Sequence, residues 1–383
     1  MSDATCLRRR MTDWRHSLHE QPEFGFEEHG TAALIARTLE DLGLEVVRGV
    51  GGTGVVASLR RGSGNRAIAL RADMDALRIA EAPGRPHGSR KPGLMHACGH
   101  DGHVAMLLGA ATTLAEEGGF DGTVRFVFQP AEEWGRGAIA MLEDNLLARF
   151  PFDEIHGIHN MPGMPLGHVE TRPGPLMAAE DIFEITLQGI GGHAARPEAG
   201  REALVAGCAL VGDLQTIASR RLSPSEAAVL SVTEVLTDGA RNVLPGNVRI
   251  LGDARSFSAA TSARIEAEMR RIAAGIGQSY ALEVTVDYRR EFVPLVNDPA
   301  LVGEVLAAAS TQPGVTVSGA AEAVCASEDF ARFLDHVPGV FTFLGNGVDS
   351  APLHNPSYDF NDDLLLTGAG LFAAIARRRL PDR

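Results

Sequence analysis

The stretch Val124-Arg125-Phe126-Val127-Phe128-Gln129-Pro130-Ala131-Glu132-Glu133 says most about the fold of this chain. Its first five residues, Arg125 excepted, are the β-branched and aromatic residues typical of a buried strand. Two carboxylates follow almost directly, at the kind of strand end where α/β proteins place their active sites. The stretch therefore predicts a sheet strand that leads into a reactive site.

Similar apolar runs lie on both sides of this strand, and helical patterns alternate with them. The apolar runs are 55–59, 67–70 and 155–158, and the helical patterns cover 27–43, 102–117 and 137–148. Alternating strands and helices predict an α/β sheet that is covered by helices on both faces. The α/β pattern returns from about residue 291, and a closing helix is expected at 362–379, after Asn361.

The pattern changes between about residues 178 and 290. Phe183, Ile185 and Leu187 alternate with polar residues, which is typical of a strand with one solvated face. More strand patterns follow at 229–236, 247–252 and 282–287, with helical patterns at 201–218 and 262–276. Two helices on one face of an antiparallel sheet form a self-sufficient α+β two-layer unit. We therefore expect an insert of ordinary domain size inside a larger domain.

The composition limits the classes of function. The 383 residues exceed the roughly 250–300 at which a single core stops growing. A net charge of −14 argues against nucleic acid and anionic membranes as partners. The four cysteines have no framework spacing, which favours a reducing compartment. With neither a signal peptide nor an apolar run of about 18 residues, we expect a cytoplasmic protein.

The run His96-Ala97-Cys98-Gly99-His100-Asp101-Gly102-His103 concentrates metal-binding side chains. Cysteine, imidazole and carboxylate groups bind borderline divalent metals. Cys98 and His100 are two residues apart, so in an extended segment both would point to one side and reach one ion. A lone Cys-x-His would more often be structural, but here three histidines and a cysteine fall within eight residues.

Further candidates lie elsewhere in the chain. Adjacent carboxylates such as Glu132 and Glu133 can divide the roles of base and ligand in metal-assisted hydrolysis. His159 ends a strand-like run, and His354 lies in a proline-containing loop. Taken alone, each of these two histidines is more often a hydrogen-bonded loop residue than a ligand. Asp73 and Asp75 also follow a strand and could orient histidine ligands.

The segment Gly49-Val50-Gly51-Gly52-Thr53-Gly54 matches the G-x-G-x-x-G pattern of dinucleotide-binding proteins. It lies between two strand-like runs and opens no helix, so its amides cannot combine with a helix N-terminus to hold a pyrophosphate. We therefore predict a hairpin here rather than a nicotinamide site.

Long sequence blocks, together covering nearly the whole chain, resemble the aminoacylase/carboxypeptidase type of co-catalytic metallopeptidase. More narrowly they are similar to its amidohydrolase branch, which contains hippurate hydrolases, N-acyl-amino-acid deacylases and plant indole-acetyl-amino-acid hydrolases. The blocks are 18–28, 70–77, 95–103, 128–133, 189–197, 242–245, 327–330 and 353–356.

The resemblance implies a site with two divalent metal ions, Mn or Zn, with Co or Ni also compatible. It implies that Glu132 is the general base and that Cys98 bridges the ions. The full set of implied ligands is Cys98, His100, Glu133, His159 and His354. Most other branches have a His-x-Asp motif where this chain has Asp73-Met74-Asp75, so Asp73 is not counted among the ligands.

The resemblance also implies a layout and an assembly. An α/β mixed-sheet catalytic domain, 1–177 and 291–383, would carry an inserted α+β lid or dimerisation domain at 178–290. The protein would form a homodimer or a dimer-based homo-oligomer. His193 matches a lid histidine that reaches the neighbouring subunit's site. Asn242 and Arg255 match lid positions that grip the substrate carboxylate, for which a planar guanidinium is suited. From sequence alone, Arg255 could equally be a surface arginine after a strand.

These features predict a metal-dependent amidohydrolase that cleaves N-acyl amino acids to a carboxylic acid and a free amino acid. Within the same family, a dipeptidase or an N-acetyl-diaminopimelate-type deacetylase is the alternative. A non-catalytic metal-binding protein with the same fold is a rival of another class. It is disfavoured because Glu132 is present together with all five implied ligands.

Overall fold

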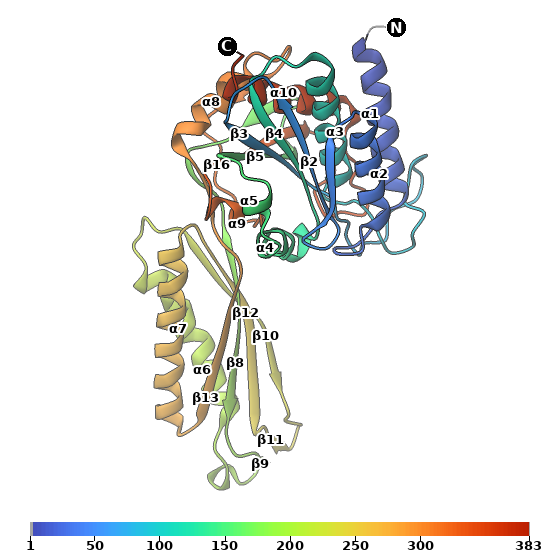
Figure 1. The fold of residues 1–383 in the computed structure, drawn as a ribbon. Coiled ribbons are helices and arrows are strands. Elements are labelled where there is room, and N and C mark those ends of the chain that lie inside the picture. The colour runs from blue at the N-terminus through green and yellow to red at the C-terminus, as the bar shows by residue number, and fades with distance from the viewer. Residues whose placement is uncertain (1–2, 383) are drawn as a thin grey trace. The chain divides into compact units, whose positions relative to one another are not determined.

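The computed structural model describes residues 3–382. They form two compact units (Figure 1). Unit 1 consists of residues 1–176, 296–322 and 328–383, and unit 2 of residues 177–295 and 323–327. The sequence patterns placed the insert at 178–290 and gave no sign that the short segment 323–327 belongs with it. The short strands β7 (Gly174–Met177) and β14 (Leu295–Asn297) lie where the chain passes between the units.

Unit 1 is built on an eight-stranded sheet in the order β1-β2-β4-β3-β5-β16-β6-β15. Its strands are β1 (Glu45–Val50), β2 (Gly54–Arg61), β3 (Ala67–Asp73), β4 (Gly122–Gln129), β5 (Glu154–Pro162), β6 (His168–Glu170), β15 (Thr316–Ser318) and β16 (Gly339–Gly347). The central strands β4, β3, β5 and β16 are parallel, whereas β1–β2, β2–β4 and β6–β16 pair antiparallel. The sheet is therefore mixed, and the predicted α/β class is confirmed.

Helices cover the sheet of unit 1 (Figure 1). They are α1 (Asp3–Glu20), α2 (His29–Asp41), α3 (His100–Glu117), α4 (Gly137–Glu143), α5 (Leu146–Arg149), α8 (Pro299–Ala309), α9 (Ala331–Leu334) and α10 (Leu365–Arg379), with short 3-10 turns η1 (Glu132–Trp134) and η4 (Asp362–Leu364). Helix α3 is the central one, because it is buried on nearly all sides and packs against α1, α10 and β3. An apolar surface all round is typical of a core helix.

Unit 2 is a two-layer α+β unit, as the alternating pattern predicts. A four-stranded antiparallel sheet has the order β10-β12-β8-β13, and the helices cover one of its faces. Its elements are β8 (Ala179–Gln188), β9 (Gly192–His193), η2 (Pro197–Ala199), α6 (Ala203–Thr216), the π-helical turn η3 (Ile217–Arg221), β10 (Ala228–Thr237), β11 (Val243–Leu244), β12 (Asn247–Ser256), α7 (Ala259–Tyr280) and β13 (Glu283–Phe292). Alternate residues of β8 are buried, including Phe183, Ile185 and Leu187, and they form the core with both helices.

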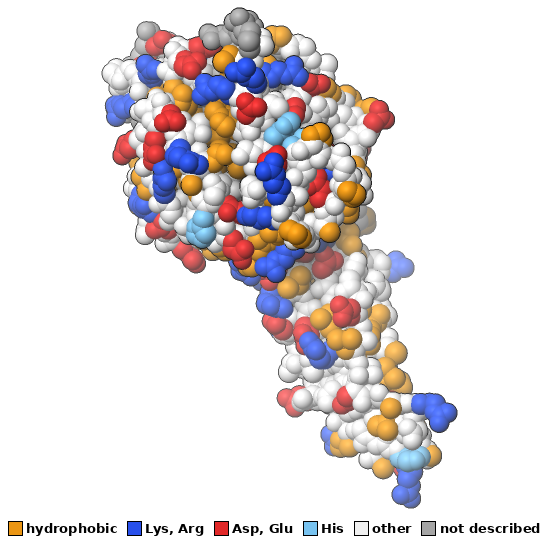
Figure 2. Space-filling model, turned by 90° about the vertical axis from the view of Figure 1, so that its right-hand side faces the viewer, with side chains coloured by type: hydrophobic (Ala, Val, Ile, Leu, Met, Phe, Trp, Pro, Cys, Tyr) orange, Lys and Arg blue, Asp and Glu red, His pale blue; other side chains and the backbone are white. Residues whose placement is uncertain are grey.

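Several smaller expectations can be compared with the structure. The glycine pattern at 49–54 turns between the antiparallel strands β1 and β2, so the predicted hairpin is confirmed. None of the helices in residues 3–382 has the length and apolarity needed to cross a membrane. All four cysteines are free thiols; Cys98 is buried, and Cys6, Cys208 and Cys325 are exposed. On the face drawn in Figure 2, acidic and basic side chains are interspersed.

Candidate metal centre

The candidate site lies at the carboxyl ends of β3, β4 and β5, which are adjacent and parallel. Asp73 is the last residue of β3, the turn η1 with Glu132 and Glu133 follows β4, and His159 is near the end of β5. His354 comes from a loop that is tied to the site, because its N–H donates to the Ala97 carbonyl at 2.8 Å. The fold thus gathers side chains from four separate parts of the chain.

The Cys98-Gly99-His100 segment is a tight turn into α3, so the expectation of an extended segment is wrong. Gly99 has φ 94°, a conformation that glycine adopts easily, and His100 is the first residue of the helix. A Cβ at Gly99 would lie 2.2 Å from Asn160 Oδ1, so the site also needs glycine for space. Despite the turn, Cys98 and His100 both point toward His159, and Cys98 Sγ lies 3.5 Å from His159 Nε2.

Two groups of potential ligands overlap at Cys98. In the first, one donor atom each from Cys98, His100 and His159 lies within 4.8 Å of the others. In the second, the same holds for Cys98, Glu133 and His354, with His354 Nε2 at 3.4 Å from Glu133 Oε2. A shared cysteine between two such groups is an arrangement that could serve two neighbouring ions.

The unused atoms of this cluster fit a divalent cation. His100 Nδ1 is engaged by Asp75, at 3.0 Å from the carbonyl and 3.2 Å from Oδ1. Its Nε2 is buried and has no hydrogen-bond partner in the described part of the chain, and neither has Glu133 Oε1, 3.9 Å away. His159 Nδ1 faces the Asn160 carbonyl at 2.7 Å, which fixes the proton there and leaves Nε2 free to bind. Buried polar atoms without partners are rare, and an ion is one explanation for them.

The electrostatics of the cluster also favour a cation. Burial, together with the charges of Glu133 and Glu132, raises the pKa of the Cys98 thiol well above its ordinary value. A coordinated metal is what makes a buried thiol give up its proton. Burial also lowers the pKa of His159 well below its ordinary value, which keeps the imidazole in the neutral form that metals bind.

The other two histidines of the run lie outside the two groups that share Cys98. His103 Nδ1 lies 2.6 Å from Asp73 Oδ1, and its Nε2 accepts from the Asn160 N–H at 3.0 Å. Both ring nitrogens are therefore used within the protein. His96 is buried beside His19, with 6.3 Å between the ring centroids, and neither of its ring nitrogens has a hydrogen-bond partner among the described residues. Asp101 pairs with Arg15 and His19, on the α1 side of α3.

Glu132 is 6% exposed and lies among other carboxylates. Its carboxylate is within 4.8 Å of those of Glu328 and Asp329. Burial raises the pKa of Glu132 well above its ordinary value, and the charges of Glu328, Glu133 and Asp329 add to the effect. A raised pKa brings a carboxyl group closer to the range in which it can both accept and donate a proton. The sequence alone predicted no role for Glu328 and Asp329. Their only distinguishing feature there is that they are adjacent acidic residues within the block 327–330, which resembles the metallopeptidase family.

Unit 2 holds the predicted catalytic residue His193 and the predicted substrate-binding residues Asn242 and Arg255. His193 is exposed in β9, and the backbone carbonyl of its neighbour Asn242 accepts from the Ala194 N–H at 3.1 Å. Arg255 is near the far end of β12, with Nη2 at 2.8 Å from Glu180 Oε1. At about 3.3 Å per residue, the intervening strand separates Asn242 and Arg255 by about 25 Å. The structure therefore does not bring these two residues together within one chain.

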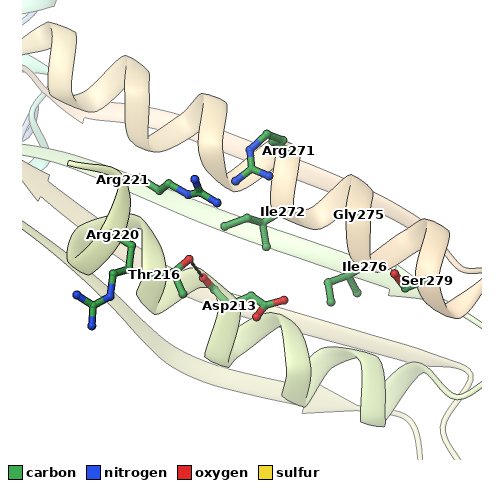
Figure 3. A pocket seen from close by; sticks show the side chains of 9 residues that line it. All are labelled: Asp213, Thr216, Arg220, Arg221, Arg271, Ile272, Gly275, Ile276 and Ser279. Carbon is green, nitrogen blue, oxygen red and sulfur yellow. Dashed lines mark hydrogen bonds between the residues drawn. The ribbon is translucent and has the colours of Figure 1, made fainter.

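A hollow of about 460 Å³ in unit 2 lies between α6, η3 and α7 (Figure 3). Its lining includes Arg220, Arg221 and Arg271, but Glu268 lies 2.6 Å from Arg271 Nη2 and 3.6 Å from Arg221 Nε. It is lined by no cysteine or histidine and by none of the predicted site residues. We therefore place the chemistry in the cluster around Cys98 and not here.

Known hydrolases are similar to this chain over nearly its whole length. The model of peptidase family M20/M25/M40 matches residues 69–378. The hippurate hydrolase of Campylobacter jejuni is 37% identical, over 96% of this chain and 95% of its own. The N-acetyl-L-cysteine deacetylase of Bacillus subtilis is 36% identical, over 98% of this chain and 89% of its own. A solved Bacillus subtilis structure, described as a dinuclear metal-binding peptidase from the M20 family, has a TM-score of 0.87 at 32% identity and covers 98% of this chain and 99% of its own.

The fold, the ligand cluster and these relatives define a metal-dependent hydrolase. The chain belongs to peptidase family M20/M25/M40, and within it to the amidohydrolase branch, so the resemblance expected from sequence is confirmed.

Proposed function

We propose that this protein hydrolyses the amide bond of N-acyl amino acids. Two relatives support the substrate class, since one is named for hippurate and the other for N-acetyl-L-cysteine, both N-acylated amino acids. The observation that carries the proposal is the position of Glu132, a buried carboxyl group beside two overlapping groups of metal-binding atoms. Such a pair of features suits hydrolysis by an activated water.

Cys98, His100, Glu133, His159 and His354 would hold the two metal ions, and Cys98 belongs to both groups of potential ligands. The mixed sulfur, nitrogen and oxygen donors are compatible with Mn or Zn, and also with Co or Ni. When bound, the ions would polarise the scissile carbonyl and lower the pKa of a water. Asp75 orients His100 through its Nδ1 and so directs Nε2 to the ion.

The side chains of the protein then move the protons. Glu132 accepts a proton from the water as the hydroxyl adds to the acyl carbon. The C–N bond breaks, and Glu132 returns the proton to the leaving amine, so the same carboxyl group acts first as a base and then as an acid. His193 would stabilise the oxyanion, and Asn242 and Arg255 would bind the free carboxylate of the substrate. The separation of Asn242 and Arg255 fits this only if one of them acts in the partner's site.

The exposed edge of the unit 2 sheet supports a homodimer. Strand β10 is an edge strand with a single charged residue and exposes Val229, Val235 and Leu236. The opposite edge, β13, carries five charged residues, which discourage strand pairing. Helix α6, which contacts β10, exposes Leu204 and Val205. The free thiols suit a reducing compartment such as the cytoplasm.

The substitution Glu132→Gln tests the assigned base. It keeps the shape of the side chain but removes the proton acceptor, so turnover should fall by about 10²–10⁴-fold or more. Elemental analysis should give the same metal content as in the wild type. Glu143→Gln, at the exposed end of α4, is the matched control and should leave turnover unchanged. Normal turnover in Glu132→Gln would remove Glu132 from the mechanism.

The substrate class is tested with purified protein to which Mn, Zn, Co or Ni has been restored. The panel contains hippurate, N-acetyl amino acids, dipeptides and N-acetyl-diaminopimelate. Fastest hydrolysis of an N-acyl amino acid would support the proposal. A preference for dipeptides or for the diaminopimelate derivative would favour the corresponding alternative. No hydrolysis of any compound by the metal-loaded protein would contradict the proposed function.

A further inference from the structure

Arg71 lies at the centre of a buried polar cluster beside Glu132. It is 1% exposed, and its Nε donates to Gln129 Oε1 at 2.8 Å. Its terminal nitrogens donate to Asp73 at 2.8 Å, to Glu328 at 2.9 Å and to Asp329 at 3.3 Å. Removing one partner from a buried charge network is costly, so these side chains hold one another in fixed positions.

Asp329 connects this cluster to both ends of the loop that carries the two site glutamates. Its Oδ1 accepts from Gln129 Nε2 at 2.6 Å, and Gln129 is the last residue of β4. Its Oδ2 accepts from the Ala138 N–H at 2.9 Å, in the first turn of α4. A single carboxylate therefore fastens the start and the end of the loop 130–137.

The loop does not adopt its shape through local preference. Ala131 has φ 47°, in the left-handed region, which costs a non-glycine residue roughly 1–2 kcal/mol. A Cβ at Gly137 would lie 1.5 Å from the Pro130 carbonyl oxygen, so the two ends of the loop are in close contact. Strained conformations of this kind persist only where contacts from outside impose them. Asp329 supplies such contacts at both ends.

Asp329 also reaches Glu132 directly. Its backbone N–H lies 3.4 Å from Glu132 Oε1, and the carboxylates of Glu132, Glu328 and Asp329 are within 4.8 Å of one another. We propose that Asp329, held by Arg71, is a positioning residue that fixes the Glu132 loop for proton transfer. The inference rests on the proposed function, because that is where Glu132 acquires its role.

The substitution Asp329→Asn separates this role from mere burial. An asparagine offers one acceptor oxygen, and its NH₂ group would face the donor of either Gln129 or Ala138. One end of the loop is then released. Since a displacement of about 1 Å can cost about 10²-fold in rate, we expect kcat to fall about 10–100-fold. KM should stay within about twofold, and the metal content should equal that of the wild type.

Two comparison variants and a substrate-free measurement complete the experiment. Hydrogen–deuterium exchange of a peptide covering 129–138 should be faster in Asp329→Asn than in the wild type. Glu328→Gln removes the same charge from Arg71, but Glu328 is bonded to Arg71 and the Phe330 N–H instead of the loop ends. In the Glu328→Gln variant, hydrogen–deuterium exchange of the peptide 129–138 should be as slow as in the wild type. Asp181→Asn is the control for loss of a buried carboxylate; in unit 2, Asp181 accepts from Ser262 at 2.6 Å and Tyr288 at 2.7 Å.

The control Asp181→Asn should lower thermal stability while leaving kcat and the exchange of 129–138 unchanged. The proposal is overturned if Asp329→Asn keeps the wild-type kcat, or loses kcat without faster loop exchange. It is also overturned if Glu328→Gln lowers kcat equally with unchanged exchange, since charge alone would then be the cause. If the wild type hydrolyses nothing in the panel, the proposed function fails, and the exchange comparison by itself decides whether Asp329 holds the loop.

Discussion

At the scale of single residues, hydrogen bonding at the ring nitrogens separates the proposed ligand His100 from its neighbour His103. His100 Nε2 has no partner among residues 3–382, whereas His103 is bonded at both nitrogens. We expect His100→Gln to bind fewer ions per chain. His103→Gln should bind the wild-type number at saturating metal, with affinity about 10–100-fold weaker. Elemental analysis and chelator competition measure both quantities, and the reverse result would exchange the two assignments.

Glu154, at the start of β5, provides a pH-dependent contribution to stability away from the site. Burial opposes its ionisation, but hydrogen bonds from His156 and Arg379 outweigh burial and lower its pKa from 4.5 to about 2. The folded state therefore binds the proton less readily than the unfolded state. The stabilisation is complete above pH 4.5 and is lost as the pH falls toward 2.

Glu154→Gln should accordingly lower the free energy of unfolding at pH 7. We expect the free energy of unfolding to fall by about 1–2 kcal/mol. The effect is limited because Arg66, one of the arginines that pair with Glu154, is 45% exposed and its charge is screened by water. Denaturant unfolding at pH 7 and pH 3.5 checks this, and the difference between variant and wild type should shrink at the lower pH. A difference that grows in acid would contradict the assigned direction of the pKa shift.

At the scale of elements, the turn into α3 depends on Gly99. Alanine there would have to adopt φ 94° and would bring its Cβ within 2.5 Å of the Tyr358 hydroxyl and closer still to Asn160. We expect Gly99→Ala to lower both metal content and melting temperature. Gly93 has φ 79° with no atom near its missing Cβ, so Gly93→Ala should cost only about 1–2 kcal/mol. If Gly99→Ala and Gly93→Ala lower the melting temperature equally, the close contacts at Gly99 do not contribute to stability.

Elements with a regular apolar pattern could be predicted from sequence, and others could not. The runs at 67–70 and 124–128 are buried strands whose residues are all apolar except Arg125. Helix α1 was not foreseen, since its buried face includes Arg15 and His19, which pair with Asp101 of α3. The helix expected at 137–148 ends at Glu143, because Asn145 takes a left-handed conformation and a separate short helix, α5, begins after it.

The residues of the candidate site could be predicted from sequence only where several of them lie close together along the chain. Cys98 and His100 stand in a dense metal-binding run, and the Glu132–Glu133 pair follows a clear strand. The role of Asp329 depends on contacts with Gln129 and Ala138, about 200 positions earlier, which no local pattern reveals. Long-range polar pairs of this kind become visible only in the folded structure.

At the scale of the whole molecule, the proposed dimer makes a prediction about the β10 edge. Val235 is 44% exposed on that strand. A lysine there would place a charge in the proposed interface, so Val235→Lys should sediment as a monomer where the wild type sediments as a dimer. Val296→Lys, an equally exposed valine in unit 1, is the control and should remain dimeric. If Val235→Lys also sediments as a dimer, β10 is not part of the interface.

The dimer also predicts complementation between inactive chains. If His193 serves the partner's site, a His193→Ala chain mixed with a Glu132→Gln chain restores one complete site in each mixed dimer. After subunit exchange, activity should recover toward a quarter of the wild-type value, whereas each variant alone stays inactive. No recovery in a mixture with demonstrated exchange would argue for a site built within one chain.

The distribution of thiols gives the molecule a ready set of labelling positions. Cys98 is shielded, while Cys6 in α1 and Cys208 in α6 are accessible and belong to different units. In a chain with Cys325→Ser, a maleimide spin label would attach once to each unit and leave the reactive centre unmodified. Pulsed electron paramagnetic resonance on that chain, mixed with a large excess of unlabelled chain so that each dimer carries one labelled copy, would read the distance between the units with and without substrate.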